Sequence, residues 1–185
     1  MKKALSFPLL LVGIALVAIG GYSMNQALDG KAQVRDGLTA ANVTTPSDAS
    51  IPNARVDDAA TARSMAQWID GTMAKATNGR NWNEVGHYLT AAGTDTDDVT
   101  QAAIGADGQP TVNPLRQVAF EASTGSTGLN TSVLAFKVAD LTLIMGAVMA
   151  LLGLGTAGMG LAMTGLSLAT VSRRVHVPHP HLHRA

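Results

Sequence analysis

Histidine is the residue type in this sequence best suited to bind a metal, and four of its five copies lie in the last ten residues. The tail VHVPHPHLHRA holds them together, and such tracts can bind zinc, nickel or copper. The alternative is a cytoplasmic tail that its arginines attract to anionic lipid head groups. We adopt this second interpretation and keep as metal candidates His176, His179, His181 and His183.

The acidic run TDTDD is the other group that could bind a cation, through Asp95, Asp97 and Asp98. It lacks the Asp-x-Asp-x-Asp-Gly spacing of a calcium loop, so we interpret it as a solvated acidic loop. His87 stands alone outside the tail, and one imidazole builds neither a metal site nor, without a nucleophile-elbow motif, a Ser-His-Asp triad. The sequence therefore predicts no catalytic residue, no cofactor and no small-molecule substrate, and we expect a protein that is not an enzyme.

Two uncharged apolar segments, residues 4–22 and 141–171, dominate the rest of the chain. A helix of about 20 residues crosses a bilayer core of about 30 Å, so each segment is long enough to span. Neither contains Asp, Glu, Lys, Arg or His, which removes the usual mark of an ion or proton pathway. A cleaved signal peptide is the alternative for the first segment, but its apolar run is long and no clear cleavage site follows.

Charge is divided between the ends and the middle of the chain, although the total is zero. All 13 acidic residues lie between Asp29 and Asp140, whereas the charged residues outside this range are all basic. Basic flanks place both termini in the cytoplasm. We therefore expect a multi-pass protein of the cell membrane, with residues 1–3 and 172–185 cytoplasmic and 23–140 extracytoplasmic.

The predicted fold class is an all-α membrane protein with two transmembrane helices and a small extracytoplasmic helical domain. Pro46 and Pro52 make residues 39–54 a loop. A helix should begin at Asp57 or Asp58 and run to about Ala76, where Gly79 supplies a left-handed cap. We expect a second helix over residues 81–93, then a loop, then helix from about residue 115 with an interruption at 123–128.

Small residues recur along the second apolar segment at spacings of four and three, which places them on one stripe of a helix. Lipid is as apolar as leucine, so membrane helices associate where small residues let their backbones approach. The predicted packing residues are Gly146, Ala150, Gly153, Ala157, Gly160 and Thr164. Their partner is either the first segment, which offers Gly13, Gly20 and Gly21, or another chain; a second small row contains Gly158.

Three stretches resemble a known family: ASIPNARVDDAATARSMAQWI, TNGRNWNEV and LNTSVLAFKVADLTLIMGAVMALLGLG. They are similar to small actinobacterial two-pass membrane proteins that often carry the label aromatic ring-opening dioxygenase. The resemblance implies an anchor-loop-anchor layout. The label implies a non-haem iron held by histidines and a carboxylate, and His87 alone cannot build that site.

The combined expectation is a non-enzymatic accessory or scaffold protein of the cell envelope. Its partners would be the lipid bilayer and either itself or a larger membrane complex, with no nucleic acid. The alternative is a membrane sensor that relays an outer signal to the C-terminal tail.

Overall fold

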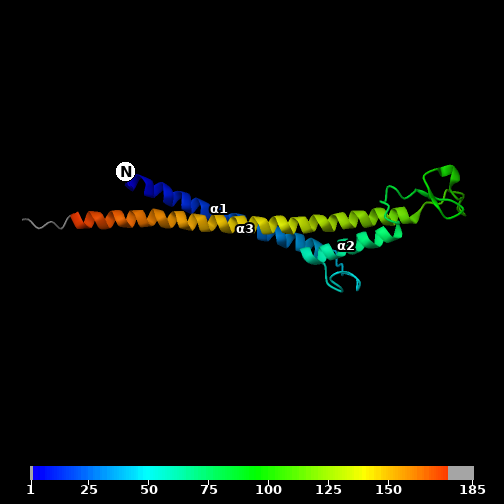
Figure 1. Cartoon of the computed structure of the whole chain (residues 1–185), viewed down its shortest axis with the longest axis horizontal. Helices are drawn as coiled ribbons and strands as arrows, with labels where there is room; N and C mark the ends of the chain where they lie inside the picture. Colours follow the sequence, from blue (N-terminus) through cyan, green and yellow to red (C-terminus); the bar gives the residue numbers. More distant parts are fainter. Residues whose placement is uncertain (1, 175–185) are drawn as a thin grey trace, which may run out of the picture. The chain divides into compact units, whose positions relative to one another are not determined.

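The computed structural model describes residues 2–174, with side chains for residues 7–163. The element order is α1 (Lys2–Ala40), α2 (Ala59–Ala76), β1 (Tyr88–Leu89), β2 (Asp95–Thr96), the 3-10 turn η1 (Val99–Gln101) and α3 (Pro114–Arg174) (Figure 1). Helices α1 and α3 are both long and apolar enough to span a membrane. The prediction of a mostly helical chain with two such helices is confirmed.

The interruption predicted at residues 123–128 is wrong, because α3 is continuous through them. Hydroxyl groups there bond within the helix: Thr124 donates to the carbonyl of Phe120 at 3.0 Å and Thr127 donates to that of Ser123 at 2.8 Å. Serine and threonine in a helix can bond one turn back in this way, which satisfies their hydroxyls without breaking the helix.

The described chain folds as two compact units. Unit 1 comprises the residues up to Asp29 and from Ala139 onwards, and unit 2 is Gly30–Val138. In unit 1, α1 and α3 run in opposite directions (Figure 1).

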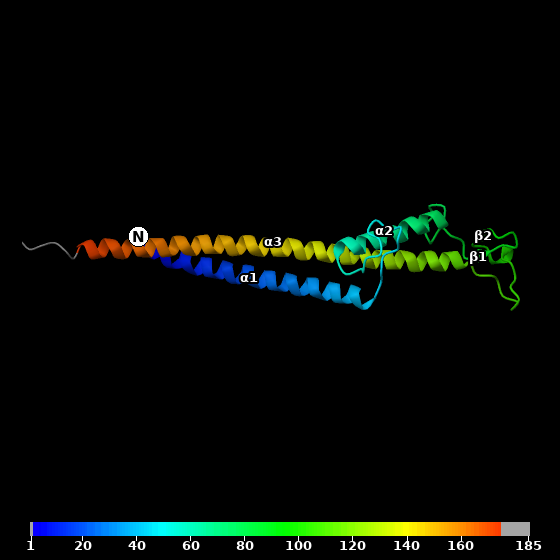
Figure 2. The same cartoon turned by 90° about the horizontal axis from the view of Figure 1, so that it is seen from below.

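Unit 2 has its own apolar core, in which α2 lies along the first part of α3 (Figures 1 and 2). Ala62 of α2, Val133 of α3 and Val56 of the preceding loop are buried together. Partly buried side chains complete the cluster, namely Leu38, Val43, Met65 and Leu129. The core therefore joins both long helices, α2 and the loop between α1 and α2 within one unit. That loop begins after Ala40, because α1 continues through residues 39 and 40 of the predicted 39–54 loop.

The prediction for α2 is confirmed at both ends. The Asp58 carboxylate accepts a hydrogen bond from the backbone N–H of Thr61 at 2.8 Å, and this bond holds the pKa of Asp58 below its usual value. The helix ends at Ala76, and Asn78 and Gly79 follow with positive φ. Such left-handed residues commonly terminate helices.

The helix predicted over residues 81–93 is wrong, so the second unit is not purely helical. β1 pairs antiparallel with β2, with Tyr88 opposite Thr96 (Figure 2). Gly86 packs so tightly there that a Cβ on it would lie 2.5 Å from the Thr96 nitrogen. This close contact between two backbones requires the segment to be extended. A helix over the same residues could not form it.

Candidate functional site

In unit 1, α1 packs backbone to backbone against the small-residue stripe of α3. A Cβ built on Gly13 would stand 2.5 Å from the backbone nitrogen of Ala157 and 2.7 Å from the carbonyl oxygen of Gly153. Conversely, a Cβ on Gly153 would stand 2.6 Å from the carbonyl oxygen of Gly13 and 2.7 Å from the nitrogen of Val17. Only a hydrogen fits between the two backbones at this level.

A second contact of the same kind lies seven residues later in α1 and seven residues earlier in α3. A Cβ on Gly20 would stand 2.5 Å from the carbonyl oxygen of Gly146 and 2.7 Å from the nitrogen of Ala150. The Cγ of Met24 would lie 2.7 Å from a Cβ on Gly146. A seven-residue repeat keeps the seam between two helices in register. The glycine α-hydrogens at the Cβ positions point at carbonyl oxygens, as in Cα–H···O contacts.

The structure thus places four of the six predicted packing residues against α1: Gly146, Ala150, Gly153 and Ala157. Gly160 is also buried, whereas the side chain of Thr164 lies outside the described residues. Gly21 and Gly158, which the sequence also offered, have open space where a Cβ would stand, as far as the described chain extends.

Large apolar side chains cover the remainder of the two helices. Leu151 is 68% exposed and Ile14 is 55% exposed. Other exposed apolar side chains of the pair include Leu11, Val12, Ile19, Ile144, Val148, Leu152, Leu154 and Met159. Such a surface suits hydrocarbon rather than water.

The acidic run is hydrogen-bonded within unit 2, and Asp97 and Asp98 are exposed to solvent as well. The Arg80 guanidinium donates to both Asp95 carboxylate oxygens, at 2.7 and 3.3 Å, and the Gly86 N–H donates to the same carboxylate at 2.7 Å. The Arg80 bond is the main cause that lowers the pKa of Asp95 to about 2. Asp95 therefore ties three separate parts of the segment together.

The other two carboxylates of the run have protein partners as well. Asp97 accepts the backbone N–H of His87 at 3.0 Å and lies 2.7 Å from its Nδ1, and these bonds lower the pKa of Asp97. Asp98 accepts the N–H and the hydroxyl of Thr100 at the start of η1. The structure holds no group of three His, Asp or Glu suited to a metal within the described residues. His176, His179, His181 and His183 lie outside them.

Sequence reasoning missed how this segment is joined to α3. The Arg116 side chain donates to the carbonyl of Val85 and stacks over the Trp82 ring at 5.3 Å. Trp82 meets Phe120 edge to face, with ring centroids 5.1 Å apart. The buried Asn113 donates to the Gly86 carbonyl at 3.0 Å. No sequence motif marks these contacts, because the partners are about 30 residues apart.

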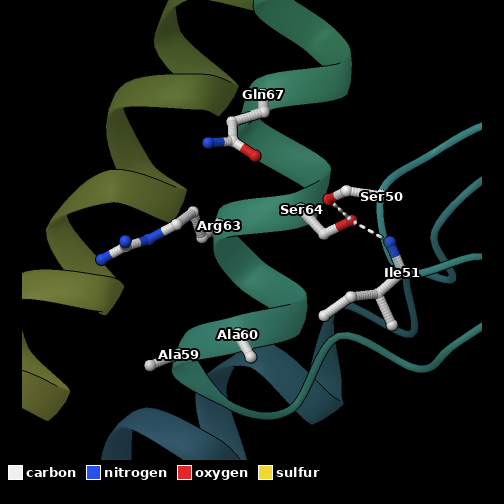
Figure 3. Close-up of a pocket in the computed structure, with 7 residues that line it drawn as sticks. All are labelled: Ser50, Ile51, Ala59, Ala60, Arg63, Ser64 and Gln67. Atoms are coloured by element: carbon white, nitrogen blue, oxygen red, sulfur yellow. Dashed lines mark hydrogen bonds between the residues drawn. The ribbon is translucent and has the colours of Figure 1, made fainter.

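A shallow pocket of about 390 Å³ lies where the loop between α1 and α2 meets α2 (Figure 3). Ser64 accepts hydrogen bonds there from the Ser50 hydroxyl at 2.9 Å and from the Ile51 N–H at 2.8 Å. The Arg63 side chain points away from these serines (Figure 3). The two hydroxyls thus fasten the loop to the helix, which is a structural role.

No protein-family model matches this chain, and neither a curated protein nor a solved structure is significantly similar to it. The resemblance to the actinobacterial membrane proteins therefore stays a prediction.

Proposed function

We propose that this chain is a two-pass membrane protein that acts as a non-enzymatic accessory subunit of the cell envelope. α1 and α3 would cross the bilayer as an antiparallel hairpin, with both termini in the cytoplasm. Unit 2 would stand on the outer side and present a folded surface to another membrane or envelope protein.

The observation that carries this proposal is the different chemistry of the two units. Unit 1 is an apolar helix pair with backbone contacts at Gly13 and Gly20 and an outward surface of exposed leucine and isoleucine. Unit 2 has its own core and the Arg80–Asp95 ion pair. An anchoring role for unit 1 accounts for its apolar surface, and a recognition role for unit 2 accounts for its separate folded core.

The glycine contacts also limit which surfaces of the chain are available to a partner protein. The stripe at Gly146 and Gly153 is occupied by the chain's own α1, so it supports the hairpin. Docking on another protein would then use unit 2 or the outward faces of the helices.

Orientation is testable directly, because the chain contains no cysteine. Ser47→Cys, in an exposed part of unit 2, should react with a membrane-impermeant maleimide on intact cells. Ala185→Cys should react only after permeabilisation. The reverse pattern would refute the proposed orientation.

Gentle detergent extraction of the native protein then tests the accessory role. We expect foreign membrane proteins to co-purify in fixed stoichiometry. Recovery as a monomer, or as a homo-oligomer alone, would refute the role of accessory subunit.

A further inference from the structure

Three short stretches of unit 2 bond to one another in a closed ring. The Leu89 N–H donates to the Thr111 carbonyl at 3.0 Å, and the Thr111 N–H donates to the Ala103 carbonyl at 2.8 Å. The Ala103 N–H closes the ring by donating to the Leu89 carbonyl at 2.8 Å. The segment between α2 and α3 is therefore a small, ordered β layer.

One face of this layer is mostly apolar. Tyr88 pairs with Val112, Thr90 with Ala102 and Ile104 with Pro110 as antiparallel bridges. Side chains directly opposite in such pairs share a face, as do residues two apart in a strand. The face, which we call the β-layer face, consists of Tyr88, Thr90, Ala102, Ile104, Pro110 and Val112.

Two residues of the β-layer face are exposed within the described chain, and the other four are half-buried. Ile104 is 65% exposed and Val112 is 64% exposed, although both lie on backbone held by hydrogen bonds. β-Branched side chains held in this way offer a rigid apolar surface to a partner. Exposed apolar patches rimmed by polar residues commonly mark interaction sites.

The rim of this face carries negative charge. Between Arg80 and Arg116 the chain contains no lysine or arginine, and it contains the five acidic residues Glu84, Asp95, Asp97, Asp98 and Asp107. Asp95 is paired with Arg80, which also lies near Glu84, and Asp97 is paired with His87 and lies near Arg116. The two arginines at the ends of this stretch do not balance its five carboxylates. Asp107 lies in the turn between Ile104 and Pro110, and Asp98 caps the turn that leads into Ala102.

We propose that the β-layer face docks a protein that presents apolar side chains ringed by lysine and arginine. This inference rests on the proposed function and identifies the surface that would serve it. Complementary charge favours a basic partner and disfavours anionic lipid. A second copy is disfavoured too, because a two-fold contact would set one acidic rim against the other.

Site-specific photocrosslinking of the full chain, in cells that make it, tests this proposal. p-Benzoylphenylalanine replaces Val112, and Val118 of α3, which is 48% exposed, serves as the matched control. Ile104 provides a second position on the face, so that one poorly folded variant does not decide the outcome. The crosslinked peptides are identified by mass spectrometry.

We expect the Val112 and Ile104 positions, but not Val118, to crosslink to a lysine- or arginine-bearing segment of one other protein. The triple variant Asp97→Asn, Asp98→Asn, Asp107→Asn retains an acceptor oxygen at each site and removes three charges. It should lower the crosslink yield about tenfold, because complementary charge accelerates association.

Several outcomes would overturn the proposal: crosslinks to a second copy, to lipid alone or to an uncharged segment, no crosslink, equal yield at Val118, or an unchanged yield in the triple variant. These outcomes are distinct from failure of the proposed function. If proteins still co-purify in fixed stoichiometry, only the β-layer face is refuted as their docking site.

Discussion

Gly20 of α1 approaches Gly146 of α3 so closely that a Cβ on Gly20 would stand 2.5 Å from the carbonyl oxygen of Gly146. Real Cβ atoms do not come this close to a backbone oxygen, so any larger residue must push the helices apart. The adjacent Gly21 has open space at the same place within the described chain. Two neighbouring glycines therefore differ completely in what they contribute.

Gly20→Ala should lower the stability of the helix pair, whereas Gly21→Ala should not. Gly20→Ala should cost about 1–3 kcal/mol through overpacking against backbone that cannot move away locally. Gly21→Ala should be neutral or slightly stabilising, because alanine is the better helix former. Unfolding of the full chain in mixed micelles measures both, and equal effects would contradict the close contact.

Gly13→Ala and Gly153→Ala should be strongly non-additive. Each glycine's Cβ position faces the other's carbonyl oxygen, at 2.7 and 2.6 Å. Once one alanine has separated the backbones, the second costs less, and coupling energies for residues in contact are about 0.5–3 kcal/mol.

The control for this double-mutant cycle is Gly13→Ala combined with Gly158→Ala, whose Cβ position is open. That pair should be additive. Additive behaviour in the contact pair as well would mean that the two glycines do not meet.

Asp95→Asn should reduce the acid sensitivity of unit 2. The pKa of Asp95 is lowered from 3.8 to about 2, chiefly by the Arg80 hydrogen bond. A carboxylate with a lowered folded-state pKa contributes stability that is present above the unfolded value and is lost as pH falls through the folded one. The wild type should therefore lose this contribution between pH about 4 and 2, and the variant should not.

Trp82 fluorescence in a Trp68→Phe background can follow this acid unfolding, because Trp82 contacts Phe120 and Arg116. Asp70→Asn, an exposed position on α2, is the matched control. An Asp95→Asn variant with the wild-type acid profile would show that the Arg80 ion pair adds nothing to stability.

Asn113→Ala should destabilise the junction between the β layer and α3. The Asn113 Oδ1 accepts the Leu115 N–H at 3.0 Å, which caps α3, and its Nδ2 donates to the buried Gly86 carbonyl. Loss of both bonds should cost about 1–3 kcal/mol.

Asn113→Ser keeps a hydroxyl that can cap the helix but loses the bond to Gly86. Its stability should therefore lie between that of the wild type and that of Asn113→Ala. Thermal unfolding followed by Trp82 fluorescence ranks the three proteins. Equal stability of the alanine and serine variants would show that the capping hydrogen bond does not contribute to the stability of the fold.

Some elements could be predicted because their causes are local. The apolar segments within α1 and α3 are evident from length and hydropathy, and the Asp58 cap and Gly79 follow from residue preferences one turn from the helix ends. The loop that contains Pro46 and Pro52 follows from these prolines, which restrict the backbone regardless of tertiary contacts. Its predicted start at residue 39 is two residues early, because α1 runs to Ala40.

Other elements could not be predicted because their causes are distant in sequence. Trp82, Val85 and Leu89 have a spacing that suits a helical face, and this led to the wrong helix at 81–93. The segment instead satisfies its backbone through Thr111 and Asn113 and anchors its carbonyl at Val85 on Arg116. These partners compete with helical hydrogen bonds and become visible only when α3 is in place.

The sequence by itself determined that the chain has two apolar helices and that one of them carries a stripe of small residues, because hydropathy and periodicity are properties of each segment alone. Tertiary structure decided which small residues pack between the helices and which residues of the other helix they contact. Gly13 and Gly20 meet the stripe because only their register brings backbone against backbone, whereas Gly21 and Gly158 point elsewhere on the same helices. A one-residue step rotates the side-chain direction by about 100° around a helix. Two neighbouring glycines therefore face different surroundings although they are the same residue type.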